Sequence, residues 1–351
     1  MKVRNLLKHD NGPIFLTLVC TILAVFVVEL LFVRGGDVSK VAFIKAMNVS
    51  NVLMQISLTG ILATSMTLVM ISGGIDLSVG QMMCFIGTAM AYMIKVVGLS
   101  NWSVVVFGLL LAVVFQVLMG LIISWTKLEP FIVSLGFMSM YKGFTYLITN
   151  GREITIEGKF TFLGKTYLNI TESFRLGMPV ITLVVLVIIM WLVSNYTKFG
   201  RSVYAVGGNE SAAYLAGINV RSLKVKLYAV NGLFVAIATM ASLSRMGTGN
   251  PLMGDGKEID VIAAVVVGGT ALSGGKGNVW GTFIGGLLLG CLSNALNILG
   301  VFPYWQYVLR GAIIILAVLL SFLSGRRAVA TGRRLSGRGA SEAKAAASPA
   351  T

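Results

Sequence analysis

Residues Gly200–Ile218 read GRSVYAVGGNESAAYLAGI, a polar stretch punctuated by glycine that separates two long apolar runs. Its second half carries the signals of a short helix, because Asn209 can cap the first turn and Glu210 places negative charge there. Gly217 can adopt the left-handed conformation that ends a helix. A helix of about two turns is marginal in water, so we expect it to dock either on its own membrane domain or on a partner.

The apolar runs beside this stretch are long enough to cross a lipid bilayer. Hydrophobic residues make up 56% of the chain and charged residues only 12%, which indicates an all-α, polytopic membrane protein with about ten transmembrane helices. The expected spans are Pro13–Val33, Asn51–Ser72, Leu77–Val97, Trp102–Trp125, Pro130–Thr149, Gly177–Asn195, Leu223–Leu243, Ile259–Leu272, Val279–Leu299 and Pro303–Phe322. The first run is too long for a signal peptide and no cleavage pattern follows it, so we expect it to stay in place as a span.

The basic residues predict which side of the membrane each loop occupies. With an even number of spans both termini lie on one side, and 16 of the 28 Lys and Arg residues fall there together with only five of the 13 acids. Because cytoplasmic loops carry such an excess, we expect cytoplasmic N- and C-termini, a cytoplasmic loop at 196–222 and an outer loop at 150–176. Residues 1–325 would form the transmembrane domain, and residues 326–351 a disordered basic tail that can rest on anionic lipid.

The composition also excludes several classes of function. A single His and three scattered Cys leave no material for a His/Cys metal site, a catalytic triad or a disulfide framework. The net charge of +15 follows membrane topology, so we expect no nucleic-acid partner. Around Lys276 the chain resembles a phosphate loop, but Thr270 and Gly277 stand where Gly and Ser or Thr are required. We therefore expect a chain that is not an enzyme, holds no metal or cofactor and does not hydrolyse ATP itself.

Two segments broken by glycine indicate where a solute could cross. Gly73–Gly80 reads GGIDLSVG and joins the second and third spans, and Gly268–Gly277 lies at the comparable place in the later half. Paired broken segments favour an internal repeat and a translocation pathway. The candidate pathway residues here are Gly73, Gly74, Asp76 and Ser78. The favoured interpretation of Asp76 is an N-cap in a tight turn at the cytoplasmic edge, and direct contact with a polar solute stays open.

Amide side chains in the apolar spans form a second group of candidates. Asn231, Asn294, Asn297 and Gln306 lie within spans or at their ends, where a polar group without a partner is costly. The last three of these are also candidate pathway residues that can bind a sugar hydroxyl. Hydrogen bonds between helices are the favoured interpretation, because amides commonly join helices in membranes.

Several of these motifs together resemble one family. They are GGIDLSVG, the loop Asn150–Arg152, the stretch Gly200–Ile218, the run IDVIAAVVVGGTALSGGKG at Ile259–Gly277, and NILGV at Asn297–Val301 before Trp305 and Gln306. Over nearly its whole length the chain is similar to the ribose-type sugar permeases of ABC importers, which take ribose, xylose, galactose and like sugars. The resemblance implies the type II importer permease fold and a multi-pass location in a bacterial plasma (inner) membrane.

The same resemblance implies the partners and the mechanism. A second permease copy or paralogue would complete the pathway, and an extracytoplasmic solute-binding protein would deliver a monosaccharide. A cytoplasmic ABC ATPase dimer, which holds the ATP and Mg, would drive alternation between inward and outward openings. Arg152, Arg175 and Arg245 are candidates for pairing with acidic groups on the binding protein, with solvated loop charges as the simpler interpretation.

In such permeases a cytoplasmic loop carries an EAA-like motif whose short helix docks in the ATPase. Ser211-Ala212-Ala213, followed after three residues by Gly217, has that spacing, although Ser211 stands where Glu would be and Glu210 lies one place early. The resemblance therefore implies that the ATPase-coupling residues are Asn209, Glu210, Ser211, Ala212, Ala213 and Gly217.

Alternative functions stay open beside this one. The related branched-chain amino-acid permeases of ABC importers are the nearest. An ion-coupled secondary transporter would need an ion site or a proton relay, for which Glu29 is the clearest carboxylate in an apolar run. A membrane-embedded enzyme ranks behind both, because His, Cys and carboxylates do not cluster in the sequence.

Overall fold

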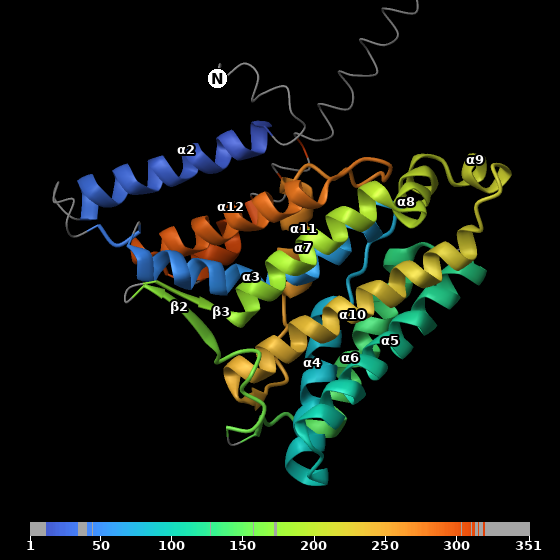
Figure 1. Cartoon of the computed structure of the whole chain (residues 1–351), viewed down its shortest axis with the longest axis horizontal. Coiled ribbons are helices and arrows are strands. Elements are labelled where there is room, and N and C mark those ends of the chain that lie inside the picture. Colours follow the sequence, from blue (N-terminus) through green and yellow to red (C-terminus); the bar gives the residue numbers. More distant parts are fainter. Residues whose placement is uncertain are drawn as a thin grey trace, which may run out of the picture. The chain divides into compact units, whose positions relative to one another are not determined.

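The structure is a computed structural model that describes residues 12–33, 41–43, 45–126, 128–156, 158–171, 174–302, 304–309, 311, 312, 315 and 319. Residues up to Gln306 form one compact unit, and those from Tyr307 onward a second. The first unit holds the helices and strands shown in Figure 1. The expected tail, residues 326–351, lies outside the described residues.

The first unit is built mainly of helices, as its composition predicts. In chain order its elements are α2 (Gly12–Val28), η1 (Glu29–Val33), α3 (Ala46–Ile71), α4 (Val79–Tyr92), η3 (Met93–Val97), α5 (Asn101–Thr126), α6 (Pro130–Thr149), β1 (Ile154–Thr155), β2 (Tyr167–Thr171), β3 (Phe174–Gly177), α7 (Met178–Tyr196), α8 (Lys198–Gly208), α9 (Glu210–Leu215), α10 (Val220–Met246), β4 (Thr248–Gly249), α11 (Lys257–Val267) and α12 (Val279–Ile298). The expected all-α, polytopic architecture is confirmed, with a small amount of sheet in addition.

Eight helices in the described part of the chain are long and apolar enough to cross a membrane. They correspond to eight of the ten expected spans. The short eighth span is present as α11, whose 11 residues reach only about 16 Å and so fall short of a hydrocarbon core. Half of the tenth, Pro303–Phe322, falls on residues outside the described ranges.

The spans differ in how much of their surface the chain itself covers. In α3, α4 and α10, 78% of the most apolar window is buried, against 33% in α5 and 17% in α2. α10 packs along α5, and the two run side by side in Figure 1. Glycines permit the close approach: a Cβ on Gly232 would lie 2.8 Å from the Ala112 carbonyl oxygen, and one on Gly120 would lie 3.0 Å from Tyr228 Cβ. Small residues at a helix interface are typical of membrane proteins, where close packing replaces the hydrophobic effect.

Segments predicted on one side of the membrane also lie together in the structure. At one end, the Gly275 N–H donates to the Ile71 carbonyl oxygen at 2.8 Å, and Tyr204 donates to the Gly277 carbonyl oxygen at 2.9 Å. At the other end, part of the predicted outer loop pairs with the chain after α10, since β1 and β4 form an antiparallel ladder that joins Ile154 to Gly249. A later part of that loop forms the antiparallel pair of β2 and β3.

The helix α8 and the contacts of Glu29 were also not predicted. The stretch after α7 begins with a separate helix, α8, whose first turn is capped by Thr197 through a hydrogen bond from the Gly200 N–H at 3.2 Å. Beside the first span, Glu29 is completely buried and accepts hydrogen bonds from the Ala42 and Phe43 N–H groups at 2.7 and 3.0 Å. Glu29 therefore holds the chain that leads into α3.

Candidate functional site

The short helix expected after Asn209 is present as α9. Asn209 Oδ1 accepts a hydrogen bond from the Ala212 N–H at 2.9 Å, which satisfies one of the free donors of the first turn. Glu210 lies in that first turn. Gly217 has a φ of +85° and ends the helix in the left-handed conformation. These local predictions are confirmed, while the contact with an ATPase stays a prediction.

The surface of α9 is almost entirely open in this chain. Asn209, Glu210, Ser211 and Ala212 are exposed, and Ala213 is the one buried residue of the helix. Tyr214 and Leu215 are 70% and 85% exposed. Large apolar side chains held in water mark a contact surface, so these two belong to the candidate site although the sequence analysis did not single them out. The available signal was their place in a helix too short to bury them.

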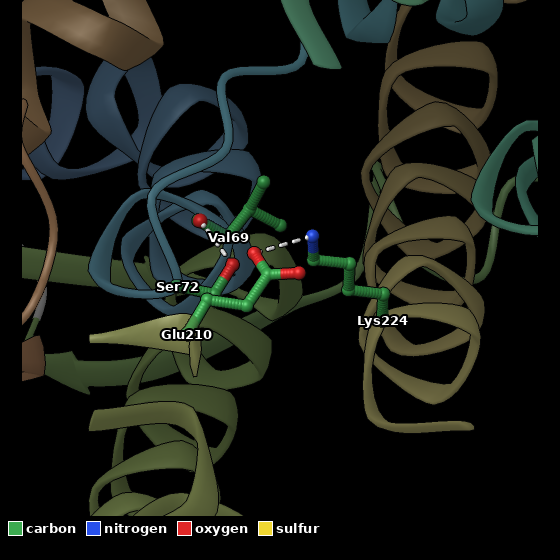
Figure 2. Close-up of polar contacts among 4 residues, drawn as sticks. All are labelled: Val69, Ser72, Glu210 and Lys224. Atoms are coloured by element: carbon green, nitrogen blue, oxygen red, sulfur yellow. Dashed lines mark hydrogen bonds and ion pairs between the residues drawn. The ribbon is translucent and has the colours of Figure 1, made fainter. Parts of the chain in front are cut away.

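An ion pair ties α9 to the start of α10. Lys224 Nζ lies 2.8 Å from Glu210 Oε2. Figure 2 shows the two side chains reaching toward each other from separate helices. The Glu210 side chain is 54% exposed and that of Lys224 is 18% exposed. The figure also draws Ser72 at the end of α3, whose hydroxyl donates to the Val69 carbonyl oxygen at 2.7 Å. The pair is accessible to solvent, so we expect it to orient α9 with little effect on overall stability.

Asp76 lies in the interior, and its carboxylate accepts hydrogen bonds from Ser78 and from side chains on two other helices. Its Oδ1 accepts from the Ser78 N–H at 2.8 Å and from the Ser78 hydroxyl at 2.6 Å. Its Oδ2 accepts from Gln116 Nε2 on α5 and from Asn231 Nδ2 on α10, both at 2.8 Å. Asn231 Oδ1 in turn accepts from the Ser65 hydroxyl on α3 at 2.7 Å. We call these five residues the Asp76 hub, which joins α3, α5 and α10 to the start of α4.

The expectation that Asp76 is the N-cap of the next helix is therefore wrong, while its place at the cytoplasmic edge stays a prediction. Ser78 occupies the N-cap position of α4 and makes no side-chain cap hydrogen bond, and Asp76 is 0% exposed. The physical reason is the path of the chain. After Gly74 the segment 74–78 runs into the protein rather than turning at its surface, which brings the carboxylate to donors on α5 and α10. Figure 1 shows this extended segment between the end of α3 and α4.

A further side chain supports the backbone of this broken segment. The Leu77 N–H donates to the Ser134 hydroxyl oxygen at 3.1 Å, and Ser134 lies near the start of α6. Backbone groups that leave a helix inside a membrane protein need such partners, because lipid offers none. The segment is thus held by side chains from α5, α6 and α10.

The two glycine-broken segments begin in the same way. Gly73 after α3 and Gly269 after α11 both have a φ of +86°. The next N–H in each case closes the helix end, from Gly74 to the Val69 carbonyl oxygen at 3.0 Å and from Thr270 to that of Val265 at 3.2 Å. This is the ending that a left-handed glycine allows. The matching geometry is what an internal repeat would produce.

The remaining candidate pathway residues, Asn294, Asn297 and Gln306, form hydrogen bonds with other amide side chains. Asn294 on α12 and Asn48 on α3 exchange two amide hydrogen bonds, at 2.8 and 3.0 Å. Gln306 Nε2 donates to Asn297 Oδ1 at 2.8 Å. The Asn48–Asn294 pair therefore joins two helices. A contact between any of these residues and a sugar stays a prediction.

The three candidate arginines lie near the predicted outer loop. Arg152 is exposed, and its N–H donates to the Thr149 carbonyl oxygen at 3.0 Å at the end of α6. Arg175 lies on β3, where its backbone carbonyl accepts a hydrogen bond from the Ser50 hydroxyl. Arg245 reaches the Met54 carbonyl oxygen, with Nη1 at 3.4 Å. Pairing of these residues with a binding protein stays a prediction.

The glycine-rich segment around Lys276 packs against other backbone. Gly274 and Gly275 have positive φ. A Cβ on Gly274 would lie 3.0 Å from backbone atoms of Gly73 and Gly207, and one on Gly275 would lie 3.0 Å from Gly208 Cα. In the described part of the chain, His, Cys, Asp and Glu nowhere gather in threes as metal ligands.

Comparison with known proteins gives the class to which this fold and site belong. The family model described as "branched-chain amino acid transport system / permease component" matches residues 48–318. The match covers well over half of the chain, so the chain belongs to this family of ABC importer permeases. No solved structure matches it.

The relatives narrow the class further. The ribose import permease protein of Bacillus subtilis (strain 168) is 40% identical over 284 residues, which cover 80% of this chain and 86% of the relative. That of Escherichia coli (strain K12) is 37% identical over 275 residues, covering 78% and 85%. The xylose transport system permease protein of Escherichia coli (strain K12) is 32% identical over 378 residues, covering 92% and 94%. The chain is a ribose-type sugar permease of the ABC importers, as its motifs predict, and a transport subunit rather than an enzyme.

Proposed function

We propose that this chain is the membrane-spanning subunit of an ATP-driven importer that takes a monosaccharide of the ribose type from a solute-binding protein. The observation that carries the proposal is the 40% identity to a ribose import permease across 80% of the chain. The xylose permease, at 32% identity over 92% of the chain, supports a sugar as the solute without deciding which one.

The proposed direction of transport follows from charge. The end of the molecule that contains α8, α9 and the start of α10 carries the basic loop residues counted above, so we assign it to the cytoplasm of a bacterium. Both termini then lie in the cytoplasm, and the β1–β4 ladder and the β2–β3 hairpin face the solute-binding protein. Arg152 and Arg175 lie in that outer region and are our candidates for contact with acidic groups on it.

ATP hydrolysis belongs to a separate subunit in this proposal. The chain lacks a phosphate loop at Lys276, so ATP and Mg would be held by a cytoplasmic ABC ATPase dimer. The exposed face of α9, with Tyr214 and Leu215, would dock there. ATP binding would draw the ATPase subunits together, and the α9 helices of two permease subunits would move with them. The membrane dimer would alternate between inward and outward openings.

A pull-down from native membranes in mild detergent tests the partner assignment. We expect an ABC ATPase and a second permease chain to co-purify with the tagged wild-type chain. Replacing Gly217 with Val should abolish ATPase recruitment and uptake without affecting membrane insertion, because a β-branched residue cannot adopt a φ of +85° without strain. Gly208→Ala is the matched control, since a Cβ there meets nothing within 4 Å. Recovery of the wild-type chain alone would reject the ATP-driven mechanism in favour of ion-coupled transport.

The family description leaves a branched-chain amino acid as the second candidate solute. Uptake of radiolabelled ribose, xylose and leucine into membrane vesicles that contain the chain and its co-purified partners separates the two. We expect sugar uptake that requires ATP and the binding protein. Uptake of leucine and of neither sugar would show that the solute is an amino acid. The proposed partners and mechanism would be unaffected. Reversing the charge at Arg152 should weaken uptake that depends on the binding protein, and unchanged uptake would argue against docking there.

A further inference from the structure

Three glycine-containing segments meet where α8 ends. They contribute Gly73 after α3, Gly207 near the end of α8, and Gly274 and Gly275 between α11 and α12. We call these four residues the glycine junction. The segments come from distant parts of the sequence, and two of them are the glycine-broken segments that the sequence analysis paired.

The junction is a contact of backbone on backbone. A Cβ on Gly207 would lie 1.7 Å from the Ile71 carbonyl oxygen and 2.7 Å from the Gly275 nitrogen. A Cβ on Gly274 would lie 3.0 Å from both the Gly207 carbonyl oxygen and Gly73 Cα. Side chains at these positions would force the segments apart, whereas the glycines permit the Gly275 N–H to reach the Ile71 carbonyl oxygen at 2.8 Å.

A hydrogen bond one turn earlier on α8 reinforces the junction. The Tyr204 hydroxyl donates to the Gly277 carbonyl oxygen at 2.9 Å. Burial raises the pKa of Tyr204, so the hydroxyl keeps its proton and remains a donor near neutral pH. Val203 and Val206 on the same helix are buried, so α8 is anchored by its side chains as well as by its end.

The glycine junction lies between the proposed ATPase-docking helix and the two glycine-broken segments. On one side, only Asn209 separates α8 from α9, the proposed ATPase-docking helix. On the other side, Gly73 leads through residues 74–78 to the Asp76 hub and α4, while Gly274 and Gly275 lead to α12. A displacement of α8 therefore reaches both broken segments by direct contact. Close-packed backbone transmits such a movement because it has no side chains that can change rotamer to absorb it.

We propose that Gly207 and Tyr204 are positioning residues that transmit the movement of α8 and α9 to both broken segments, and so couple ATP hydrolysis to opening of the sugar pathway. This inference rests on the proposed function. Gly207 acts by letting the backbones touch, and Tyr204 by holding the segment after Gly275 to α8. Neither residue contacts ATP or sugar in this account.

The test uses the full chain purified with its ATPase subunit, reconstituted in liposomes with the binding protein and radiolabelled ribose. Three quantities are measured: ATPase recruitment, ATP hydrolysis, and ribose imported per ATP hydrolysed. For Gly207→Ala we expect normal recruitment and continued hydrolysis, with ribose imported per ATP reduced at least about fivefold, the lower range of coupling between sites. Tyr204→Phe removes one hydrogen bond and should reduce the same ratio by a smaller factor.

Gly208→Ala is the matched control, because it lies next to Gly207 on the same helix and a Cβ there meets nothing within 4 Å. It should keep the wild-type ratio. A wild-type ratio in Gly207→Ala, or an equal loss in Gly208→Ala, overturns the inference. If the Gly207→Ala chain fails to insert into the membrane, the Tyr204→Phe variant provides the test. An unchanged amount of ribose imported per ATP hydrolysed in Tyr204→Phe would then overturn the inference. A wild-type chain that recruits no ATPase instead refutes the proposed function, and the inference falls with it.

Discussion

The helix α9 and the segment 72–78 are both short polar interruptions between apolar spans, yet they are stabilised in opposite ways. α9 is exposed and completes its hydrogen bonds with its own neighbours, through Asn209 at one end and Gly217 at the other. The segment 72–78 carries a fully buried Asp76 and depends on side chains from α5, α6 and α10. A polar break in a membrane chain can therefore be either a self-contained surface element or a site where several helices are joined.

The largest effect expected from this comparison follows removal of the Asp76 carboxylate. Asp76→Ala leaves donors on Gln116, Asn231 and Ser78 without their acceptor, and each buried orphan costs about 1–3 kcal/mol. We expect a large fall in the midpoint of thermal unfolding in detergent, measured by size-exclusion chromatography after heating. Ser211→Ala on α9 is the control and should stay within about 0.5 kcal/mol of wild type. An Asp76→Ala chain as stable as wild type would mean that the hub does not hold the helices together.

A smaller and local effect is expected at the cap of α9. Asn209→Ala removes the acceptor for the Ala212 N–H, a loss of about 1 kcal/mol. Because α9 is self-contained, amide exchange should accelerate over residues 210–216 while the unfolding midpoint of the whole chain stays the same. Asn209→Asp keeps an acceptor and should restore slow exchange. A fall in the midpoint of thermal unfolding of the whole chain with Asn209→Ala would show that α9 is part of the cooperative core. The contrast between α9 and the segment 72–78 would then not hold.

The smallest effect concerns the ion pair between Glu210 and Lys224. Since Glu210 is exposed, we expect Glu210→Gln to change stability by less than about 1 kcal/mol. A double-mutant cycle with Lys224→Gln, read by amide exchange over α9 at low and high salt, isolates the pair. The coupling should shrink as salt is raised. A coupling energy that is large and independent of salt would show that the Glu210–Lys224 pair is shielded from solvent. In that case α9 would be stabilised by buried contacts, as the segment 72–78 is.

The sequence signals for α9 were sufficient because they are local. Asn209, Glu210 and Gly217 act on neighbours within a few positions, so their roles in the helix follow from spacing alone. The same holds for the spans, whose length and hydropathy are properties of one segment each. The missed helix α8 had a local signal as well, in the Thr197 cap.

Partners far along the chain could not be predicted in this way. Nothing near Asp76 in the sequence indicates that Gln116 or Asn231 will donate to it, so a cap on the following helix was the natural expectation. The glycine junction shows the same limit, because a Gly pair predicts a turn but not which other backbone will touch it. The exposed Tyr214 and Leu215 were missed although their place in a short helix was a local signal, because their exposure also depends on which parts of the chain pack nearby.

The Asp76 hub also imposes an order on synthesis. Its carboxylate is made first, and its donor on α10 follows 155 residues later. At a translation rate of about 5–20 residues per second, that interval lasts on the order of ten seconds or more. During it the nascent chain holds a carboxylate that still lacks its Asn231 donor. We therefore expect the segment 72–78 to complete its hydrogen bonds only after α10 has been made.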